Sequence, residues 1–440
     1  MKFSFKLRKG VTWHAGSPLT ADDVAYSIMF LKNVHPRGRA TFANVKEVEV
    51  PDAETVIIRL AKPAPYLLKA FAACESPMVP RHRYEGADVG RSPNASAPIG
   101  TGPFMFKEWL RGRHILYERN PVYWEAPKPY FDYLTVHVIA DPVRRLAAIE
   151  DGSVTLAPAT PLSLRQIEQL RGRPELGFET NGYQYLNQVV RIEFNLDDPI
   201  LNDIRVRQAI AHAIDRQEIL RIAWRGYGEL ASGPISPALT PFRTTAKSPP
   251  AFDPAQAERL LDAAGLERGR DGNRFHLFHD FVPAGEQYEE TAFQIKLALE
   301  RVGVAVTVRK QDFPSYLKRI YTDRDFSFAT NRANNMFDPT VGVQRLFWSK
   351  NFRPGLPFSN ASHYANDEVD QRLEEAAIEP NPNKRLAYFS QFQELVARDL
   401  PDITLLAPDQ ITIYRSDLRD HSITADGVAG NLADAYFAER

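Results

Sequence analysis

Few side chains in this sequence are spaced as catalytic or metal-binding groups usually are. The patterns H-E-x-x-H, G-x-S-x-G, C-x-x-C and the phosphate-binding P-loop are all missing from it. His276 and His279 have a spacing that could bind a metal, but in a strand they would point to opposite faces. Asp22 and Asp23 could form a carboxylate pair, but at a helix N-terminus they would stabilise the helix dipole instead. We therefore predict no catalytic residue, no metal site and no cofactor.

The residues best suited to hold a small molecule are amides and aromatic rings in one C-terminal stretch. Asn331, Arg332, Asn334 and Asn335 come at the end of a predicted strand, and Trp348 follows shortly after them. Uncharged amides, one guanidinium and a large ring suit hydrogen bonding and stacking on a polar ligand. A polar loop after a strand is the alternative explanation for the same residues.

The elements that would position these groups form a mixed α/β pattern. Residues 45–50 and 55–60 alternate like the two strands of a hairpin. A T-x-x-D box that begins at Thr20 predicts the start of a helix. A helix over 286–302 runs into a glycine and then a strand over 304–308, which favours a mixed or parallel sheet.

Composition limits the class of protein. A chain of 440 residues is too long for one hydrophobic core, so two or three packed units are expected. Lys and Arg number 54 and Asp and Glu 55, so no strong field would attract nucleic acid. Cys74 is the only cysteine, which excludes an intrachain disulfide. No apolar stretch approaches the ~18 residues of a membrane span.

Several segments together resemble one family, the extracellular solute-binding proteins of family 5, which is the oligopeptide, dipeptide and nickel class. The matching segments occur in order over nearly the whole chain. They are F-K-L-R-K-G-V-T-W-H-A-G-S-P-L-T-A-D-D-V at 5–24, G-T-G-P-F at 100–104, N-P-V-Y-W at 120–124, D-I-R-V-R-Q-A-I at 203–210, I-D-R at 214–216, and the helical patterns over 253–265 and 364–400.

The resemblance implies an α/β, two-lobed periplasmic-binding-protein-like fold of type II, in the large peptide-binding class, with an accessory β-rich domain. The chain would cross between the lobes twice, and the crossings would act as hinges. The implied division is an accessory domain over 1–97 that is incomplete at its N-terminus, lobe I over 98–195 and 416–440, and lobe II over 196–415.

The resemblance also implies a function without catalysis. The chain would capture a peptide or peptide-like solute in a cleft between the lobes and deliver it to the permease subunits of an ABC importer. It would act as a monomer in the periplasm, peripheral to the membrane through the permease. An opine, a sugar or a metal chelate is the alternative solute, and a hydrolase or a non-functional fragment is the alternative of another class. The expected ligand contacts are Asn331, Arg332, Asn335 and Trp348 from lobe II and Tyr183 from lobe I.

The sequence departs from the family pattern in two places. Family members usually begin with an export signal and roughly 80 further residues that build part of lobe I, so we expect an N-terminal truncation or a misassigned start codon. Peptide-binding members place an aspartate four residues before the proline that matches Pro339, where this chain has Asn335. Without that carboxylate an α-ammonium would lose a charge-assisted partner, which puts in doubt a free peptide N-terminus as the recognised group. Asp338 is expected to point elsewhere.

Overall fold

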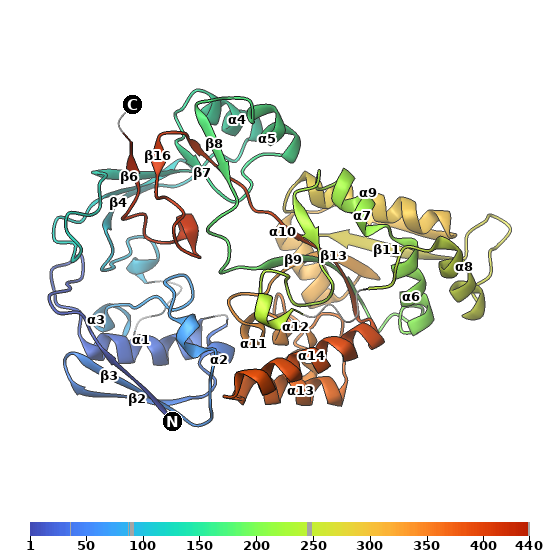
Figure 1. The fold of residues 1–440 in the computed structure, drawn as a ribbon, viewed down its shortest axis with the longest axis horizontal. Helices are drawn as coiled ribbons and strands as arrows, with labels where there is room; N and C mark the ends of the chain where they lie inside the picture. Colours follow the sequence, from blue (N-terminus) through green and yellow to red (C-terminus); the bar gives the residue numbers. More distant parts are fainter. Residues whose placement is uncertain (36, 87, 89–91, 244–248, 439–440) are drawn as a thin grey trace. The chain divides into compact units, whose positions relative to one another are not determined.

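The computed structural model describes residues 1–35, 37–86, 88, 92–243 and 249–438, which form two compact units (Figure 1). Unit 1 consists of Met1–Tyr185 with Gln410–Arg440, and unit 2 consists of Leu186–Asp409. The mixed α/β architecture agrees with the predicted fold class.

Unit 1 contains small antiparallel sheets and short helices. Its sheets have the strand orders β1-β3-β2, β4-β5-β6, β7-β15-β8 and β16-β17. Its elements are β1 (Lys2–Lys6), α1 (Ala21–Val34), α2 (Gly38–Thr41), β2 (Val45–Asp52), β3 (Thr55–Leu60), α3 (Arg81–Tyr84), β4 (Phe104–Leu110), β5 (His114–Arg119), β6 (Tyr133–His137), α4 (Pro142–Glu150), β7 (Leu156–Ala157), α5 (Leu164–Leu170), β8 (Leu176–Glu179), β15 (Thr412–Arg415), β16 (Leu418–Arg419) and β17 (Tyr436–Phe437).

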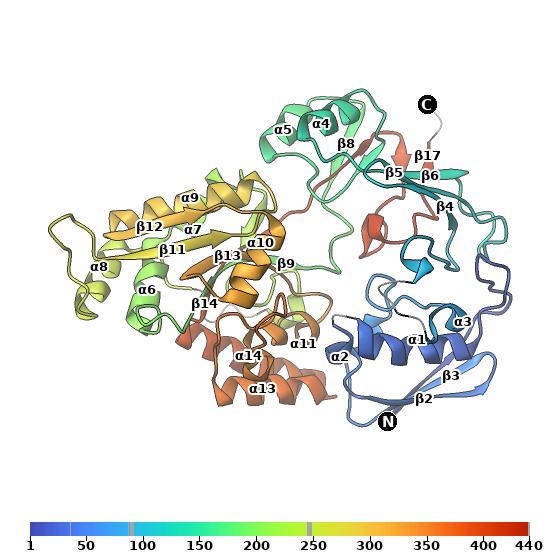
Figure 2. The same ribbon diagram turned by 180° about the vertical axis from the view of Figure 1, so that it is seen from behind.

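Unit 2 is built on a six-stranded sheet of order β10-β14-β9-β13-β11-β12. Figures 1 and 2 show α9 on one face of this sheet and α13 and α14 on the other. Its elements are β9 (Gln188–Phe194), α6 (Ile204–Ala213), α7 (Arg216–Ile222), β10 (Gly228–Leu230), α8 (Pro254–Ala263), β11 (Phe275–Phe281), α9 (Glu286–Arg301), β12 (Val304–Arg309), α10 (Phe313–Leu317), β13 (Phe328–Asn334), α11 (Pro339–Gly342), α12 (Gln344–Phe347), α13 (Asp367–Ile378), α14 (Pro382–Asp399) and β14 (Asp402–Pro408).

Local signals in the sequence determine several of these elements. Thr20 caps α1 through a complete capping box, in which the Asp23 carboxylate accepts from the Thr20 backbone N–H at 3.1 Å. The same carboxylate accepts from the indole N–H of buried Trp13 at 3.2 Å, which ties the helix start to the chain before it. The predicted helix start and the predicted hairpin, β2 with β3, are both confirmed.

The predicted step from helix to glycine to strand is also confirmed. α9 ends before Gly303, whose φ of 86° lies in the left-handed region, and β12 then pairs parallel with β11. β11 alternates as expected, because His276 is exposed and His279 is fully buried on the opposite face. Burial lowers the pKa of His279 to about 3, so the imidazole is neutral and packs as part of the core.

The two crossings between the units come earlier in the chain than the boundaries predicted at 195/196 and 415/416. β9 is a central strand of the unit 2 sheet, hydrogen-bonded to β13 on one side and β14 on the other, so it belongs to unit 2. β15 pairs with β7 and β8, so it belongs to unit 1. A separate accessory domain over 1–97 remains a prediction.

Candidate functional site

A group of polar side chains gathers at one edge of the unit 2 sheet, where β11 and β13 end and β9 begins. β13 runs antiparallel to β9 and parallel to β11, which brings these strand ends together. The carboxyl ends of parallel strands are where α/β sheets commonly bind ligands. We call this group the polar edge. It joins two sets of contacts, one among Gln188, Tyr288, Arg332 and Asn334 and one between Ser236 and Asn335.

Three residues of the polar edge form a directed series of hydrogen bonds, and Arg332 lies near its start. The Tyr288 hydroxyl, close to the Arg332 guanidinium, donates to Gln188 Oε1 at 3.2 Å. Gln188 Nε2 in turn donates to Asn334 Oδ1 at 3.0 Å. Burial raises the pKa of Tyr288 to about 12, so its hydroxyl stays protonated and can link both neighbours. This series of hydrogen bonds uses the Asn334 side-chain oxygen and leaves the Asn334 amide N–H groups as donors.

Asn335 lies beside Ser236, and both are completely buried. Asn335 Oδ1 accepts a hydrogen bond from the Ser236 backbone N–H. Asn335 Nδ2 and Ser236 Oγ have no hydrogen-bond partner within the part of the chain that the structure describes. A buried polar group without a partner costs about 1–3 kcal/mol, so these two enclosed atoms lower the stability of unit 2.

The backbone of Asn335 is held in place by α11. A Cβ added at Gly342 would lie 2.0 Å from the Asn335 carbonyl oxygen, so only glycine permits this approach. Asp338 caps the same helix and points away from the polar edge, as expected. Its carboxylate forms a buried two-pronged ion pair with Arg385, at 2.5 and 2.9 Å.

The structure does not bring Asn331 together with Arg332. Consecutive residues of a strand point to opposite faces, and Asn331 faces the side of α12. Its amide N–H groups are bonded to the Tyr321 hydroxyl at 2.6 Å and to Glu193 Oε2 at 3.3 Å. Asn331 is only 3% exposed, and its role as a ligand contact stays a prediction.

Trp348 and Tyr183 are each held by side-chain and backbone contacts within their own unit. The Trp348 indole N–H donates to Glu374 at 2.9 Å, and the ring packs against the core between α12 and α13. The Tyr183 hydroxyl lies 2.6 Å from Thr412 Oγ1 and accepts from the backbone N–H of Ala159 at 2.7 Å. Both side chains therefore have structural partners, and their predicted ligand contacts remain untested.

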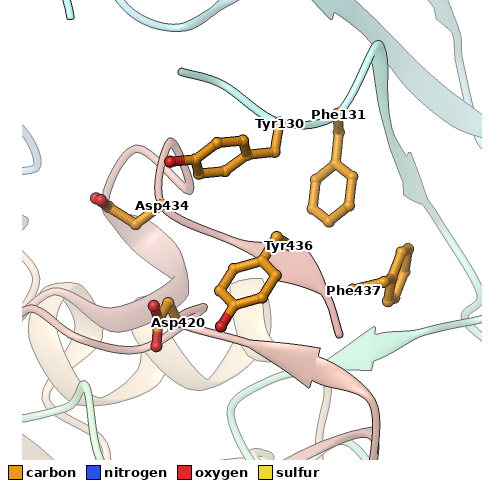
Figure 3. A pocket seen from close by; sticks show the side chains of 6 residues that line it. All are labelled: Tyr130, Phe131, Asp420, Asp434, Tyr436 and Phe437. Carbon is orange, nitrogen blue, oxygen red and sulfur yellow. The ribbon is translucent and has the colours of Figure 1, made fainter. Parts of the chain in front are cut away.

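Sequence reasoning missed a pocket of about 580 Å³ in unit 1. Figure 3 shows aromatic rings on one side of it and carboxylates on the other. Tyr130 packs edge-on against Tyr436, with ring centroids 6.1 Å apart. The only sequence signal is a pair of adjacent aromatic residues at two distant places in the chain. The lining residues are Tyr130, Phe131, Asp420, Asp434, Tyr436 and Phe437.

Within the described residues, no group of three or more His, Cys, Asp or Glu side chains is placed to hold a metal ion. In the same part of the chain, every helix is too short or too polar to cross a membrane.

Comparisons with known proteins agree on one family. The model of the bacterial extracellular solute-binding proteins, family 5 Middle, matches residues 1–354. Protein XP55 of Streptomyces lividans is 27% identical over 412 residues, which cover 92% of this chain and 72% of that protein. The oligopeptide-binding protein AppA of Bacillus subtilis is 25% identical over 433 residues, which cover 93% and 76%.

A solved structure supports the same fold. NikZ of Campylobacter jejuni, in complex with Ni(L-His), superposes with a TM-score of 0.84 at 24% identity, covering 96% of this chain and 84% of that one. Together with the family match, this confirms the fold class predicted from the sequence segments. The chain belongs to the bacterial extracellular solute-binding proteins of family 5.

Proposed function

We propose that this chain is the substrate-binding component of an ABC importer, which captures a peptide or peptide-like solute outside the cytoplasm and delivers it to a membrane permease. The observation that carries the proposal is the family match over residues 1–354. The resemblance to an oligopeptide-binding protein supports a peptide as the solute.

The polar edge of unit 2 offers chemistry that suits a peptide. A peptide presents alternating N–H donors and C=O acceptors, and each must find a partner when it leaves water. The amide groups of Asn334 and Asn335 supply both donors and acceptors.

The proposal includes no catalytic step. A nucleophilic serine needs a base in hydrogen-bond reach to remove its proton. The Ser236 hydroxyl, which belongs to the polar edge, has no such neighbour within the described residues. A bound peptide would therefore be released intact.

A metal chelate is the second candidate solute, because the structurally similar NikZ was solved with Ni(L-His). The two candidates differ in a simple way. A peptide would bind equally well in the presence of a strong chelator such as EDTA, whereas binding of nickel–histidine would be abolished by it.

The test is a binding experiment on the full chain. Isothermal titration calorimetry and thermal melts would be run with peptides of three to nine residues, with nickel–histidine and with a disaccharide as a neutral comparison. A true solute at 100 times its dissociation constant should stabilise the fold by about 2.7 kcal/mol. Mass spectrometry after prolonged incubation should recover the peptide intact. Binding of no peptide, or cleavage of one, would contradict the proposal.

Closure of two lobes around the solute stays a prediction from the family resemblance. Small-angle X-ray scattering with and without a bound solute would test it, because closure reduces the radius of gyration.

A further inference from the structure

We propose that the pocket of unit 1 shown in Figure 3 binds an organic cation that carries an alkylammonium group. The proposal goes beyond the proposed function, because it concerns a second site, on unit 1. It follows from the way the pocket is built, from its exposed rings and from the charges of its carboxylates.

Two segments that are far apart in the sequence build the pocket. β17 pairs antiparallel with β16, which brings Asp420, the residue after β16, beside Tyr436. Tyr130 and Phe131 come from the segment before β6. The Arg119 guanidinium donates to the carbonyl oxygens of both residues, at 3.1 and 3.3 Å. The side chains of the pocket therefore extend from backbone that hydrogen bonds hold in place on both sides.

The rings of the pocket are not packed fully into a core. Tyr130 is 47% exposed, Tyr436 40% and Phe437 39%. Tyr130 meets Tyr436 edge to face, with an angle of 71° between the rings, and Phe131 meets Phe437 at 53°. Such tilted pairs leave ring faces open to the pocket. The face of an aromatic ring carries negative potential and attracts cations.

One ring of the pocket holds a cation of the protein itself. Arg415 Cζ lies 4.0 Å from the centroid of the Phe437 ring, and Asp417 fixes the guanidinium through a hydrogen bond of 2.6 Å. Over the described part of the chain, no lysine or arginine is stacked on Tyr130 or Tyr436 in this way. Two rings are therefore free to make the contact that Phe437 makes with Arg415.

The carboxylates of the pocket leave one negative charge unbalanced. Asp434 forms an ion pair with Lys128. Asp420 is exposed, and its carboxylate has no ion pair or hydrogen bond among the residues that the structure describes. The neighbouring Arg419 guanidinium donates to backbone carbonyl oxygens instead. A bound cation would therefore be attracted to Asp420 without displacing a cation of the protein, although solvent screens this attraction.

The size and the walls of the pocket favour an organic cation over a metal ion. Its volume of about 580 Å³ is typical of sites for small molecules, which span about 300–1,000 Å³. Mg²⁺ and Ca²⁺ need several oxygen ligands, and the described residues contain no group of three or more His, Cys, Asp or Glu side chains that could hold a metal. Aromatic walls instead suit the apolar groups and the diffuse charge of an alkylammonium.

Choline and its uncharged isostere 3,3-dimethylbutan-1-ol separate the effect of charge from that of shape. We expect ligand-observed NMR on the full chain to show that choline binds at least about tenfold more tightly than the isostere, because the cation–π contacts and the attraction to Asp420 require the charge. Sodium chloride at the same ionic strength is the control for general salt effects.

The alkylammonium group could belong to a free small molecule or to a lysine side chain of another protein. Nα-acetyl-lysine methylamide represents the second source. Tighter binding of choline would indicate a free ammonium compound, and tighter binding of the lysine derivative would indicate a side chain. Either result supports a cation site.

Variants assign the binding to the pocket. Asp420→Asn should weaken choline binding about three- to tenfold, and Tyr436→Leu should weaken it by a similar factor. Tyr436→Phe retains the ring and should bind choline within about twofold of the parent. Asp22→Asn is the matched control, because Asp22 is an exposed aspartate on α1 of the same unit. Thermal melts establish that each variant is folded before its affinity is compared.

Three results would overturn the proposal. The first is equal affinity for choline and its isostere. The second is choline binding that neither Asp420→Asn nor Tyr436→Leu changes. The third is no binding of choline or of the lysine derivative up to about 50 mM. All of these measurements are made without a peptide, so their failure leaves the proposed function untouched, and a failure of peptide binding leaves the cation site untouched.

Discussion

A buried ion cluster on the other face of the unit 2 sheet predicts an unusual dependence of stability on pH. Arg191 is 2% exposed and lies between two carboxylates on β9 and β14. Its Nη1 is hydrogen-bonded to Asp402 Oδ2 at 3.0 Å. Its Nη2 lies 2.6 Å from Glu193 Oε1, an ion contact without hydrogen-bond geometry. One guanidinium therefore faces two carboxylates, and one negative charge remains uncompensated in the core.

The magnitude follows from Asp402. Burial, together with the charge of Glu193, raises its pKa from the ordinary value of 3.8 to about 6, against the opposing effect of Arg191. The folded protein keeps this proton up to about pH 6, whereas the unfolded chain releases it near pH 4. Stability from this group is therefore greatest below pH 4 and falls as pH rises through 6. The shift corresponds to about 3 kcal/mol.

The substitution Asp402→Asn removes the titration and retains an oxygen that can accept from Arg191. We expect the unfolding free energy of the variant, relative to the parent, to rise by about 2.5 kcal/mol between pH 4 and pH 7.5. Urea unfolding followed by tryptophan fluorescence at a series of pH values measures this difference. Asp262→Asn is the control, because Asp262 is 59% exposed on α8 and its pair with Arg274 is screened by solvent.

The result that would refute the reasoning is a constant difference between variant and parent at every pH. It would mean that Asp402 ionises alike in the folded and unfolded chain, and that water or a rearranged Arg191 compensates the second carboxylate.

Three further perturbations test the surroundings of the polar edge. Gly342→Ala should lower the unfolding free energy by about 1–3 kcal/mol and weaken solute binding, because the methyl group would collide with Asn335. Thermal melts measure the loss of stability. Gly172→Ala is the control and should leave stability unchanged, because a methyl group there would meet open space. Asp338→Asn should cost about 3–5 kcal/mol in urea unfolding, because Arg385 would be left buried and unpaired; a loss below 1 kcal/mol would contradict this. Asn335→Asp should increase the affinity for trialanine amide relative to N-acetyl trialanine about tenfold in calorimetry, since a carboxylate would then face the α-ammonium; an unchanged ratio would show that the amino end lies elsewhere.

Sequence signals predicted the elements whose causes are local. The capping box at Thr20, the glycine after α9 and the alternation around His276 each depend on residues a few positions apart, so they can be interpreted without tertiary contacts. The boundary before β9 was predicted too late, because a buried central strand looks the same in sequence whichever sheet it joins. Membership in a sheet is decided by distant pairing partners.

The candidate site was harder to predict because it depends on which face each side chain occupies. The run of residues from 331 to 335 looked like one polar surface. The strand divides it, since Asn331 bonds to Glu193 on one face while Arg332 meets Tyr288 on the other. Partners such as Gln188 and Tyr288 lie far away in sequence and carried no signal of their own. Asn335 drew attention in the sequence because the family pattern has an aspartate at that position. The structure adds Ser236 as its neighbour.

The two faces of β9 and β13 are linked by strand register. A slip of one residue would exchange the faces of every side chain in the pair. In the observed register Arg191 lies opposite Asn331, and Asp402 on β14 lies opposite Glu193. A slip of β9 would direct Arg191 and Glu193 together toward the α9 side and would separate both from Asp402 on β14. The bond between Arg191 and Asp402 thus disfavours a one-residue slip of β9, and the same slip would turn Gln188 away from Tyr288 on the other face.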